Sequence, residues 1–216
     1  MLVLASDTDP IYVRFQTSWR RYMRTNPHID CYFYKGDPTI TDDAELREDT
    51  LWIKIEDTLD TVYEKTLRAF TYFAGRLGDY DFVYRTNLSS FIDMDAYVRY
   101  YSTVPMKRFV SAFVGTYNDI TFPSGAGFTM SSDVVADLVR DAPPKVKQDD
   151  VTIGNWLMSK DIAICPVGRV EYVHETSSNN VCASDIGLFH YRIKNPNRDV
   201  DIDIHNELYR KFYTLE

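Results

Sequence analysis

The sequence predicts an α/β protein with a central, mostly parallel mixed β-sheet and helices on both faces. Two observations predict this class. Short apolar runs of strand length alternate with longer segments whose apolar residues recur at helical spacing. Parallel strands need crossover connections, and the helices in those connections cover both faces of the sheet. We expect a single domain over residues 1–216, complete or cut from a longer chain, in which the pattern changes near residue 104.

The first half shows the alternation most clearly. Strands are predicted at 1–5, 29–34, 51–55 and 81–86. Between the first two, apolar residues at helical spacing from Phe15 to Met23 predict a helix that ends before Pro27. A longer amphipathic helix is predicted over 59–77 and should stop at Gly78, with Asp57 and Asp60 as its N-cap and N3 residues.

The second half has a mixed pattern of strands and helices. Strands are predicted at 108–116 and 128–131, around a loop rich in Gly and Pro, and again at 162–165 and 170–173. Helices are predicted at 131–140, 150–159 and 204–215.

Composition and charge exclude several classes of protein. The 24 Lys and Arg against 32 Asp and Glu give a net charge of −8, which argues against a nucleic-acid binder or an anionic-membrane adhesion domain. Three cysteines without a Cys-x-x-Cys pair imply neither a zinc site nor a disulfide framework. No apolar run is long enough for a signal segment or a transmembrane helix, so we expect a cytoplasmic protein, in the host cytoplasm if it is viral.

The segments that follow the predicted strands are the candidate ligand site, because open α/β sheets bind ligands outside the carboxyl ends of their strands. These segments are Ser6–Asp9, Gly36–Asp37, Lys54–Asp57 and Thr86–Ser90. The chain has no GxGxxG, GxxxxGK[ST] or GxSxG motif, which removes the best support for dinucleotide, P-loop or hydrolase chemistry. A nucleotide bound here would need carboxylates or amides on its base and ribose, and a metal plus basic side chains on its diphosphate.

Five blocks occur in the order of a known family. They are Arg14-x-x-Thr17-Ser18-Trp19, Tyr80–Thr86, Pro123–Ser131 with its Ser-Gly-Ala-Gly, Asp149–Gly154, and Phe189–Arg192. Together they resemble the GT-A fold glycosyltransferases of the Fringe and β-1,3-galactosyltransferase type, and look most like chlorella-virus enzymes thought to decorate a major capsid protein. The resemblance implies a GT-A fold, a UDP-sugar donor, a glycan or glycoprotein acceptor and a Mn²⁺ or Mg²⁺ cofactor. It also implies a nucleotide-binding half at 1–104 and an acceptor and metal half at 105–216.

The resemblance implies Asp150 as the catalytic carboxylate, with Asp149 as the alternate candidate. Asp150 could also serve as the N-cap of the helix predicted to follow it. If the enzyme inverts the anomeric configuration, the carboxylate is the general base, whereas in a retaining enzyme it could stabilise an oxocarbenium-like state.

The metal site implied by the resemblance departs from the family pattern. Asn87 and Ser89 stand where the family has its metal-binding aspartates, and His190 stands at the family's C-terminal histidine ligand. A structural role is the alternative for His190. Asp79 and Asp81 have the spacing of an Asp-x-Asp motif, but they begin a predicted strand and so should lie away from the ligand.

Donor-binding residues are expected at both ends of the nucleotide. Ser6, Asp7 and Asp9 are candidates for the nucleoside, or else cap the helix that begins near Pro10. The other donor-binding residues expected are Arg85, Asn87, Arg192 and Lys194. Arg192 and Lys194 belong to a segment, 186–198, that has no acidic residue and is expected to form a basic loop, while Arg85 could instead pair with a buried acid.

Candidate acceptor or sugar residues are Ser124, Gly125, Gly127 and Trp156. The two glycines could let the backbone approach the sugar closely, or could form a tight turn. Trp156 has the spacing of a core residue as well.

The sequence therefore predicts an enzyme that transfers a hexose from a nucleotide-sugar to a hydroxyl of a glycan or glycoprotein, such as a viral capsid glycan. Alternatives are a nucleotide-sugar hydrolase or nucleotidyltransferase, which would share the donor site, and a non-catalytic sugar-binding module.

Overall fold

The protein was analysed as a computed structural model that describes residues 1–172, 178–180 and 188–214. Within these residues the main sheet contains β1 (Leu2–Leu4), β2 (Tyr32–Gly36), β3 (Ala44–Arg47), β4 (Thr50–Ile53), β5 (Phe82–Asn87), β7 (Val110–Tyr117), β8 (Ile120–Ser131) and β9 (Ile164–Pro166). A smaller sheet contains β6 (Ser90–Ile92), β10 (Val170–Tyr172), β11 (Ser178–Asn180) and β12 (His190–Ile193). The helices are α1 (Pro10–Arg20), α2 (Val62–Phe73), α3 (Met94–Tyr101), α4 (Ser132–Asp141), α5 (Asp149–Ser159), α6 (Arg198–Tyr213) and the 3₁₀-helix η1 (Ala74–Asp79).

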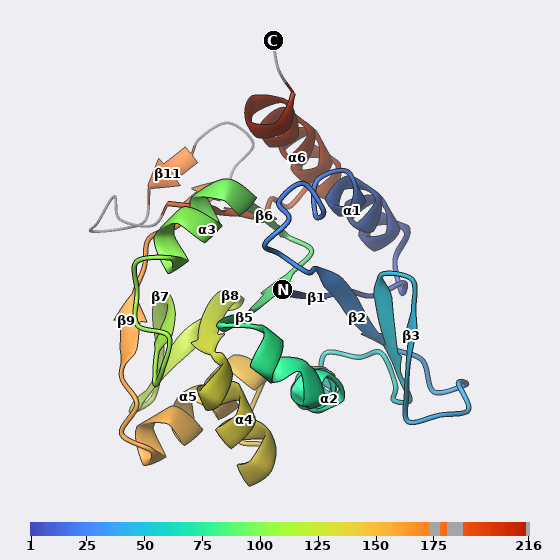
Figure 1. Ribbon diagram of the computed structural model, residues 1–216. Helices are drawn as coiled ribbons and strands as arrows, with labels where there is room; N and C mark the ends of the chain where they lie inside the picture. The colour runs from blue at the N-terminus through green and yellow to red at the C-terminus, as the bar shows by residue number, and fades with distance from the viewer. Residues whose placement is uncertain (173–177, 181–187, 215–216) are drawn as a thin grey trace.

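The predicted α/β class is confirmed, with a mixed sheet at the centre (Figure 1). The described strands of the main sheet have the order β3-β4-β2-β1-β5-β8-β7-β9. β1, β2, β4 and β5 run parallel, as do β7 and β9, whereas β3 and β8 are antiparallel to their neighbours. The carboxyl ends of β1, β2, β4, β5, β7 and β9 therefore meet at one edge.

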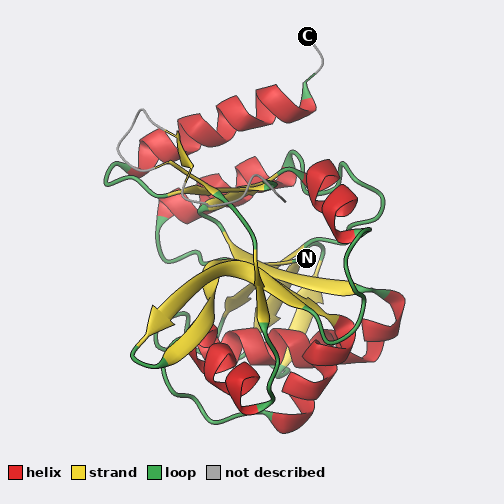
Figure 2. Cartoon of the chain, turned by 90° about the vertical axis from the view of Figure 1, so that its left-hand side faces the viewer, coloured by secondary structure: helices red, strands yellow, loops and turns green. Residues whose placement is uncertain are grey.

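Helices cover both faces of the main sheet, as predicted (Figure 2). One apolar core lies between the sheet and α2, α4 and α5, with Phe70, Leu138 and Leu157 among its buried residues. The other lies between the sheet and α1, α3, α6 and the smaller sheet, and includes Trp19 and Phe91. The sheet is thus the middle of three layers, which is a stable way to bury both of its faces.

Helix ends explain where several elements begin. Asp9 is the N-cap of α1, where its Oδ1 accepts a hydrogen bond from the Ile11 N–H, and Pro10 follows in the first helical position. The prediction that Asp57 and Asp60 start the next helix was wrong. α2 begins at Val62 with Thr61 at its N-cap, and Asp57 forms an ion pair with Lys65 from within that helix.

Two predicted loops are strands instead. The Gly/Pro segment at 123–127 lies inside β8, where Pro123 pairs with Val114 beside an irregularity in the register that accommodates a residue without an N–H. Residues His190–Ile193 of the predicted basic loop form β12, between β6 and β10. The elements β3, β6 and α3 were not predicted.

Candidate active site

The candidate site lies at the edge where the carboxyl ends of the parallel strands meet. Asn87 ends β5 beside Leu4 of β1, so it lies next to the segment that begins at Ser6. β8 runs the opposite way and brings Gly127 beside Thr86, which places Ser124 and Gly125 just beyond Asn87. Predicted residues from distant parts of the sequence are therefore brought together.

A buried ion pair joins two of the predicted residues. The Arg85 guanidinium lies 2.6 Å from the Asp149 carboxylate, and their side chains are 2% and 3% exposed. Thr66 donates a hydrogen bond to Asp149 at 2.9 Å, and Arg85 donates to the Tyr34 hydroxyl at 3.1 Å and to the Gly125 carbonyl. Burial is the largest influence on Arg85 and opposes its charge, but Asp149, Tyr34 and Asp150 together outweigh burial and raise the pKa of Arg85. Arg85 thus pairs with a buried acid, which was the alternative to donor binding in the sequence analysis. The same pairing shields Asp149 from ligands.

Of the two neighbouring carboxylates Asp149 and Asp150, Asp150 is the accessible one. Its Oδ2 accepts a hydrogen bond from the Gly125 N–H at 3.0 Å, and its Oδ1 accepts one from the Val151 N–H at 2.8 Å. Gln148, not Asp150, occupies the N-cap position of α5. Burial, and next the negative charge of Asp149, raise the pKa of Asp150 above its ordinary value. A carboxylate of raised pKa is better suited to accept a proton near neutral pH.

The two predicted glycines are needed for close contacts with side chains. A Cβ on Gly125 would lie 2.8 Å from Asp150 Oδ2, and a Cβ on Gly127 would lie 2.1 Å from the Tyr84 hydroxyl and 2.9 Å from the His190 ring. Neither glycine forms the turn that was the alternative prediction, because both lie inside β8. The absent side chains leave room for Asp150 and His190.

The three residues expected to hold a metal are engaged by protein groups. Ser89 Oγ accepts a hydrogen bond from Arg198 at 2.8 Å, and Asn87 Oδ1 accepts one from the Ser89 N–H at 3.1 Å. The Asn87 amide donates to the Gly125 carbonyl at 3.2 Å, while His190 Nε2 lies 2.9 Å from the Ser90 hydroxyl.

This donor set does not fit a divalent metal. Asn87 and Ser89 supply no carboxylate, and His190 is 4% exposed. Burial, and next the charges of Arg169 and Arg192, lower the pKa of His190 well below its ordinary value. Within the described ranges, 1–172, 178–180 and 188–214, no group of three or more His, Cys, Asp and Glu could hold a metal ion.

At the other end of the site, Asp7 belongs to a polar cluster with Lys35. Lys35 Nζ lies 2.5 Å from Asp7 Oδ2 and 4.1 Å from the centre of the Trp52 ring, and Gln16 donates to Asp7 at 2.8 Å. Burial would raise the pKa of Asp7, but the hydrogen bonds from Lys35 and Gln16 outweigh it and lower that pKa. Sequence reasoning missed Lys35 because it took Lys35 for part of the turn that ends the second strand. The Ser6 hydroxyl, which lies 2.8 Å from that of Thr8, is at the same edge, whereas Asp9 caps α1.

An arginine cluster lies beyond Ser124. Arg169 donates to Ser124 Oγ at 2.7 Å and to Glu171 Oε1 at 2.7 Å, and Arg192 donates to the same Glu171 oxygen at 3.1 Å. Lys194 is exposed, and its backbone N–H bonds to Tyr172. Sequence reasoning predicted Arg192 but missed Arg169. The signal was present, since Arg169 closely follows the strand predicted at 162–165, at its carboxyl end.

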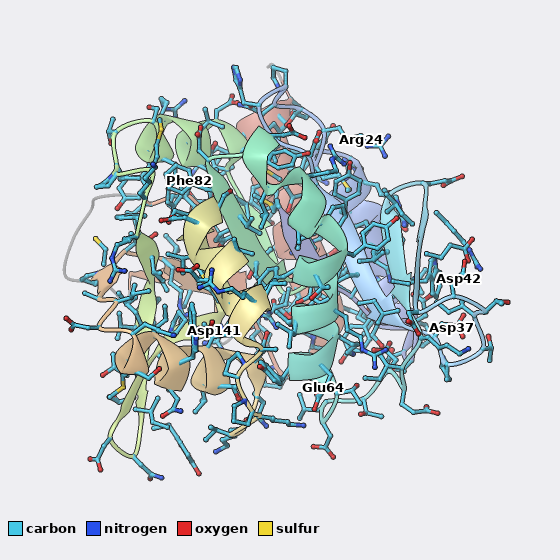
Figure 3. The ribbon with its side chains drawn as sticks, turned by 60° about the horizontal axis from the view of Figure 1, so that its bottom comes forward. Arg24, Asp37, Asp42, Glu64, Phe82 and Asp141 are labelled. Atoms are coloured by element: carbon cyan, nitrogen blue, oxygen red, sulfur yellow. The ribbon has the colours of Figure 1, made fainter. Side chains whose placement is uncertain are left out.

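Other predicted residues lie outside the site. Trp156 is 4% exposed in the core under α5 and donates its indole N–H at 3.0 Å to Asp141, which is labelled in Figure 3, so its core alternative holds. Asp79 and Asp81 line a cavity of about 660 Å³ together with Phe82, at the amino end of β5 and so opposite the site. Their position agrees with the carboxyl-end rule, which placed them away from the ligand.

Comparison with known proteins did not assign the chain to a family. No protein-family model and no curated protein matched the sequence. None of the described helices is both long and apolar enough to span a lipid bilayer. The functional assignment therefore depends on the geometry of the candidate site together with the sequence blocks.

Proposed function

We propose that the protein is a glycosyltransferase that moves a hexose from a nucleotide-sugar, most simply a UDP-sugar, to a hydroxyl of a glycan or glycoprotein. The observation that carries the proposal is the environment of Asp150. A half-buried carboxylate of raised pKa lies at the carboxyl edge of the sheet, held against Gly125. An α/β protein binds its ligands at this edge. The GT-A assignment and the cytoplasmic and capsid-glycan expectations belong to the same proposal.

The chemistry requires one group that accepts a proton and another that stabilises a departing anion. As general base, Asp150 would take the proton of the acceptor hydroxyl while that oxygen attacks the anomeric carbon. The bond from the anomeric carbon to the nucleotide oxygen breaks, and the nucleoside diphosphate leaves with its electron pair. Asp150 keeps free lone pairs for this task because each of its oxygens accepts one backbone hydrogen bond.

The test replaces Asp150 with asparagine, which keeps the shape of the side chain. Asp150→Asn should reduce transfer by about 10²- to 10⁴-fold and leave UDP affinity nearly unchanged, because the amide cannot accept the proton. Asp203→Asn is the matched control, since Asp203 is an exposed carboxylate on α6. Transfer should be measured with a panel of UDP-hexoses and glycan acceptors.

Product analysis distinguishes the remaining functions. If Asp150→Asn transfers sugar as fast as the wild-type protein, Asp150 is not the base. If the wild-type protein releases free hexose at the same rate with and without acceptors, water is the acceptor and the protein is a hydrolase.

A further inference from the structure

Two guanidinium groups share one carboxylate in the arginine cluster of Arg169, Glu171 and Arg192. Both arginines bond to Glu171 Oε1, at 2.7 and 3.1 Å. The side chains of Arg169, Glu171 and Arg192 are 6%, 13% and 30% exposed. Two positive charges against one negative charge leave a surplus of one positive charge in a partly buried place. Water screens such a charge poorly, so it attracts an anion strongly.

The surplus charge lies next to the candidate catalytic carboxylate. Arg169 donates to Ser124 Oγ, and the next residue, Gly125, donates its N–H to Asp150. In the smaller sheet, Arg192 pairs in register with Ser90, close to the end of β5. One ligand at this edge could therefore have its reacting carbon near Asp150 and its anionic part against the arginines.

The pKa shifts of neighbouring groups are consistent with this surplus of positive charge. After burial, the charges of Arg169 and Arg192 are the next causes that lower the pKa of His190. Burial and the nearby Arg192 also lower the pKa of Arg169, although Glu171 opposes this. Burial would raise the pKa of Glu171, but its two arginine partners outweigh that effect and lower it.

We propose that Arg169 and Arg192 bind the diphosphate of the nucleotide directly, so that nucleotide binding at this edge needs no divalent metal. Each planar guanidinium has five N–H donors, and a fork of two of them matches two phosphate oxygens. The poor fit of Asn87, Ser89 and His190 to a metal ion is consistent with this arrangement. The inference rests on the proposed function, and it departs from the metal dependence that the sequence resemblance implies.

The test compares UDP with uridine, which lacks the phosphates, in calorimetric titrations with EDTA present. The wild-type protein should bind UDP in EDTA, and added Mn²⁺ should change the affinity little. Arg192→Met should weaken UDP binding about ten- to a hundred-fold and leave uridine binding unchanged. The variant should fold, because Glu171 keeps its pair with Arg169. Arg192→Lys should restore part of the lost affinity.

Arg99→Met is the matched control, because it removes one positive charge from an exposed position on α3. UDP binding that appears only with Mn²⁺ would overturn the inference and leave the proposed function intact. An equal loss of UDP and uridine affinity in Arg192→Met, or no loss of either, would also overturn it. No binding of UDP in EDTA or in Mn²⁺ would contradict both proposals.

Discussion

His205 is a fully buried histidine on α6 whose two ring nitrogens have no hydrogen-bond partner among the described residues. Its ring packs edge-on against Phe15 at 5.1 Å and Phe91 at 5.7 Å, between centroids. Burial, helped by the charge of Arg198, lowers the pKa of His205 from 6.5 to about 3. The imidazole is therefore neutral in the folded protein, and protonation would place an unpaired charge in an apolar core.

This histidine should make the protein sensitive to mild acid. The pKa of His205 is lower in the folded protein than in the unfolded chain. Between these two pKa values, His205 therefore binds a proton in the unfolded chain and stays neutral in the folded protein. The contribution to stability is complete above about pH 6.5 and is lost as the pH falls from there towards 3. His205→Leu should reduce the loss in unfolding free energy between pH 7 and pH 5 by about 2 kcal/mol. Urea unfolding at the two pH values measures this.

His28→Gln is the control for the acid prediction, because His28 is exposed and should not change the pH dependence. An unchanged pH dependence in His205→Leu would show that His205 is protonated without cost in the folded protein.

For individual residues, the sequence predicted their place in the fold better than it predicted which residues they contact. Asp7, Asn87 and Asp150 lie at the expected edge because their positions depend only on where strands end and helices begin. Their contacts depend on residues far along the chain. The Arg85–Asp149 pair, for example, needs α5 to pack beside β5, which no local pattern reveals. Arg169 was missed because the carboxyl-end rule was applied only to the first four predicted strands.

Among the elements, α5 is fixed to the sheet by polar contacts as well as by its apolar face. Asp149 in its first turn bonds to Arg85 of β5 and to Thr66 of α2. Gly125 of β8 donates to Asp150 in the same turn. The position of the candidate base therefore depends on the buried ion pair beside it.

Breaking that pair should be costly, because the remaining charge would be buried without a partner. Arg85→Met should lower the free energy of unfolding by about 3–5 kcal/mol. The double variant Arg85→Met with Asp149→Leu should lose less than Arg85→Met alone, since no unpaired charge remains. Urea unfolding of the single and double variants measures both effects. A double variant that loses the full sum of the two single losses would contradict this account of the pair.

Two of the elements that were missed, β3 and β12, have a weak apolar pattern. β3 contains one large apolar residue, Leu46, among charged neighbours, and its charges suit an edge strand that must not aggregate. β12 lies in a basic segment that was interpreted as a loop. α3 did carry a signal, since Asp93 is its N-cap and Met94, Tyr97 and Tyr101 are its buried residues.

At the scale of the whole molecule, one sheet crosses the predicted boundary near residue 104. β5 from the first half pairs with β8 from the second, from Phe82 opposite Ser131 to Thr86 opposite Gly127. The two halves therefore share one sheet, with an apolar core on each of its faces.

The net charge of −8 is unevenly distributed. The acidic segment 37–60 includes the β3–β4 hairpin at one end of the sheet, and Figure 3 shows Asp37 and Asp42 at the periphery. Part of this charge is paired locally, as in the contacts of Asp49 with Arg20 and of Asp57 with Lys65. Arg169 of the arginine cluster follows β9, the strand at the opposite end of the main sheet, whereas Arg192 lies in β12 of the smaller sheet. An acidic protein can therefore still offer an anion a locally positive site.

The central claim is that a nucleotide binds at the edge of the main sheet where the carboxyl ends of the parallel strands meet. Thermal unfolding with UDP, GDP or CMP, each with and without Mn²⁺, tests this claim most directly. A ligand that binds only the folded protein stabilises it by about 2.7 kcal/mol at a hundredfold excess over Kd, or roughly 5–10 °C for a chain of this size. The account predicts a shift of that order with UDP, present without Mn²⁺, and smaller shifts with GDP and CMP. No shift with any nucleotide under either condition would contradict it.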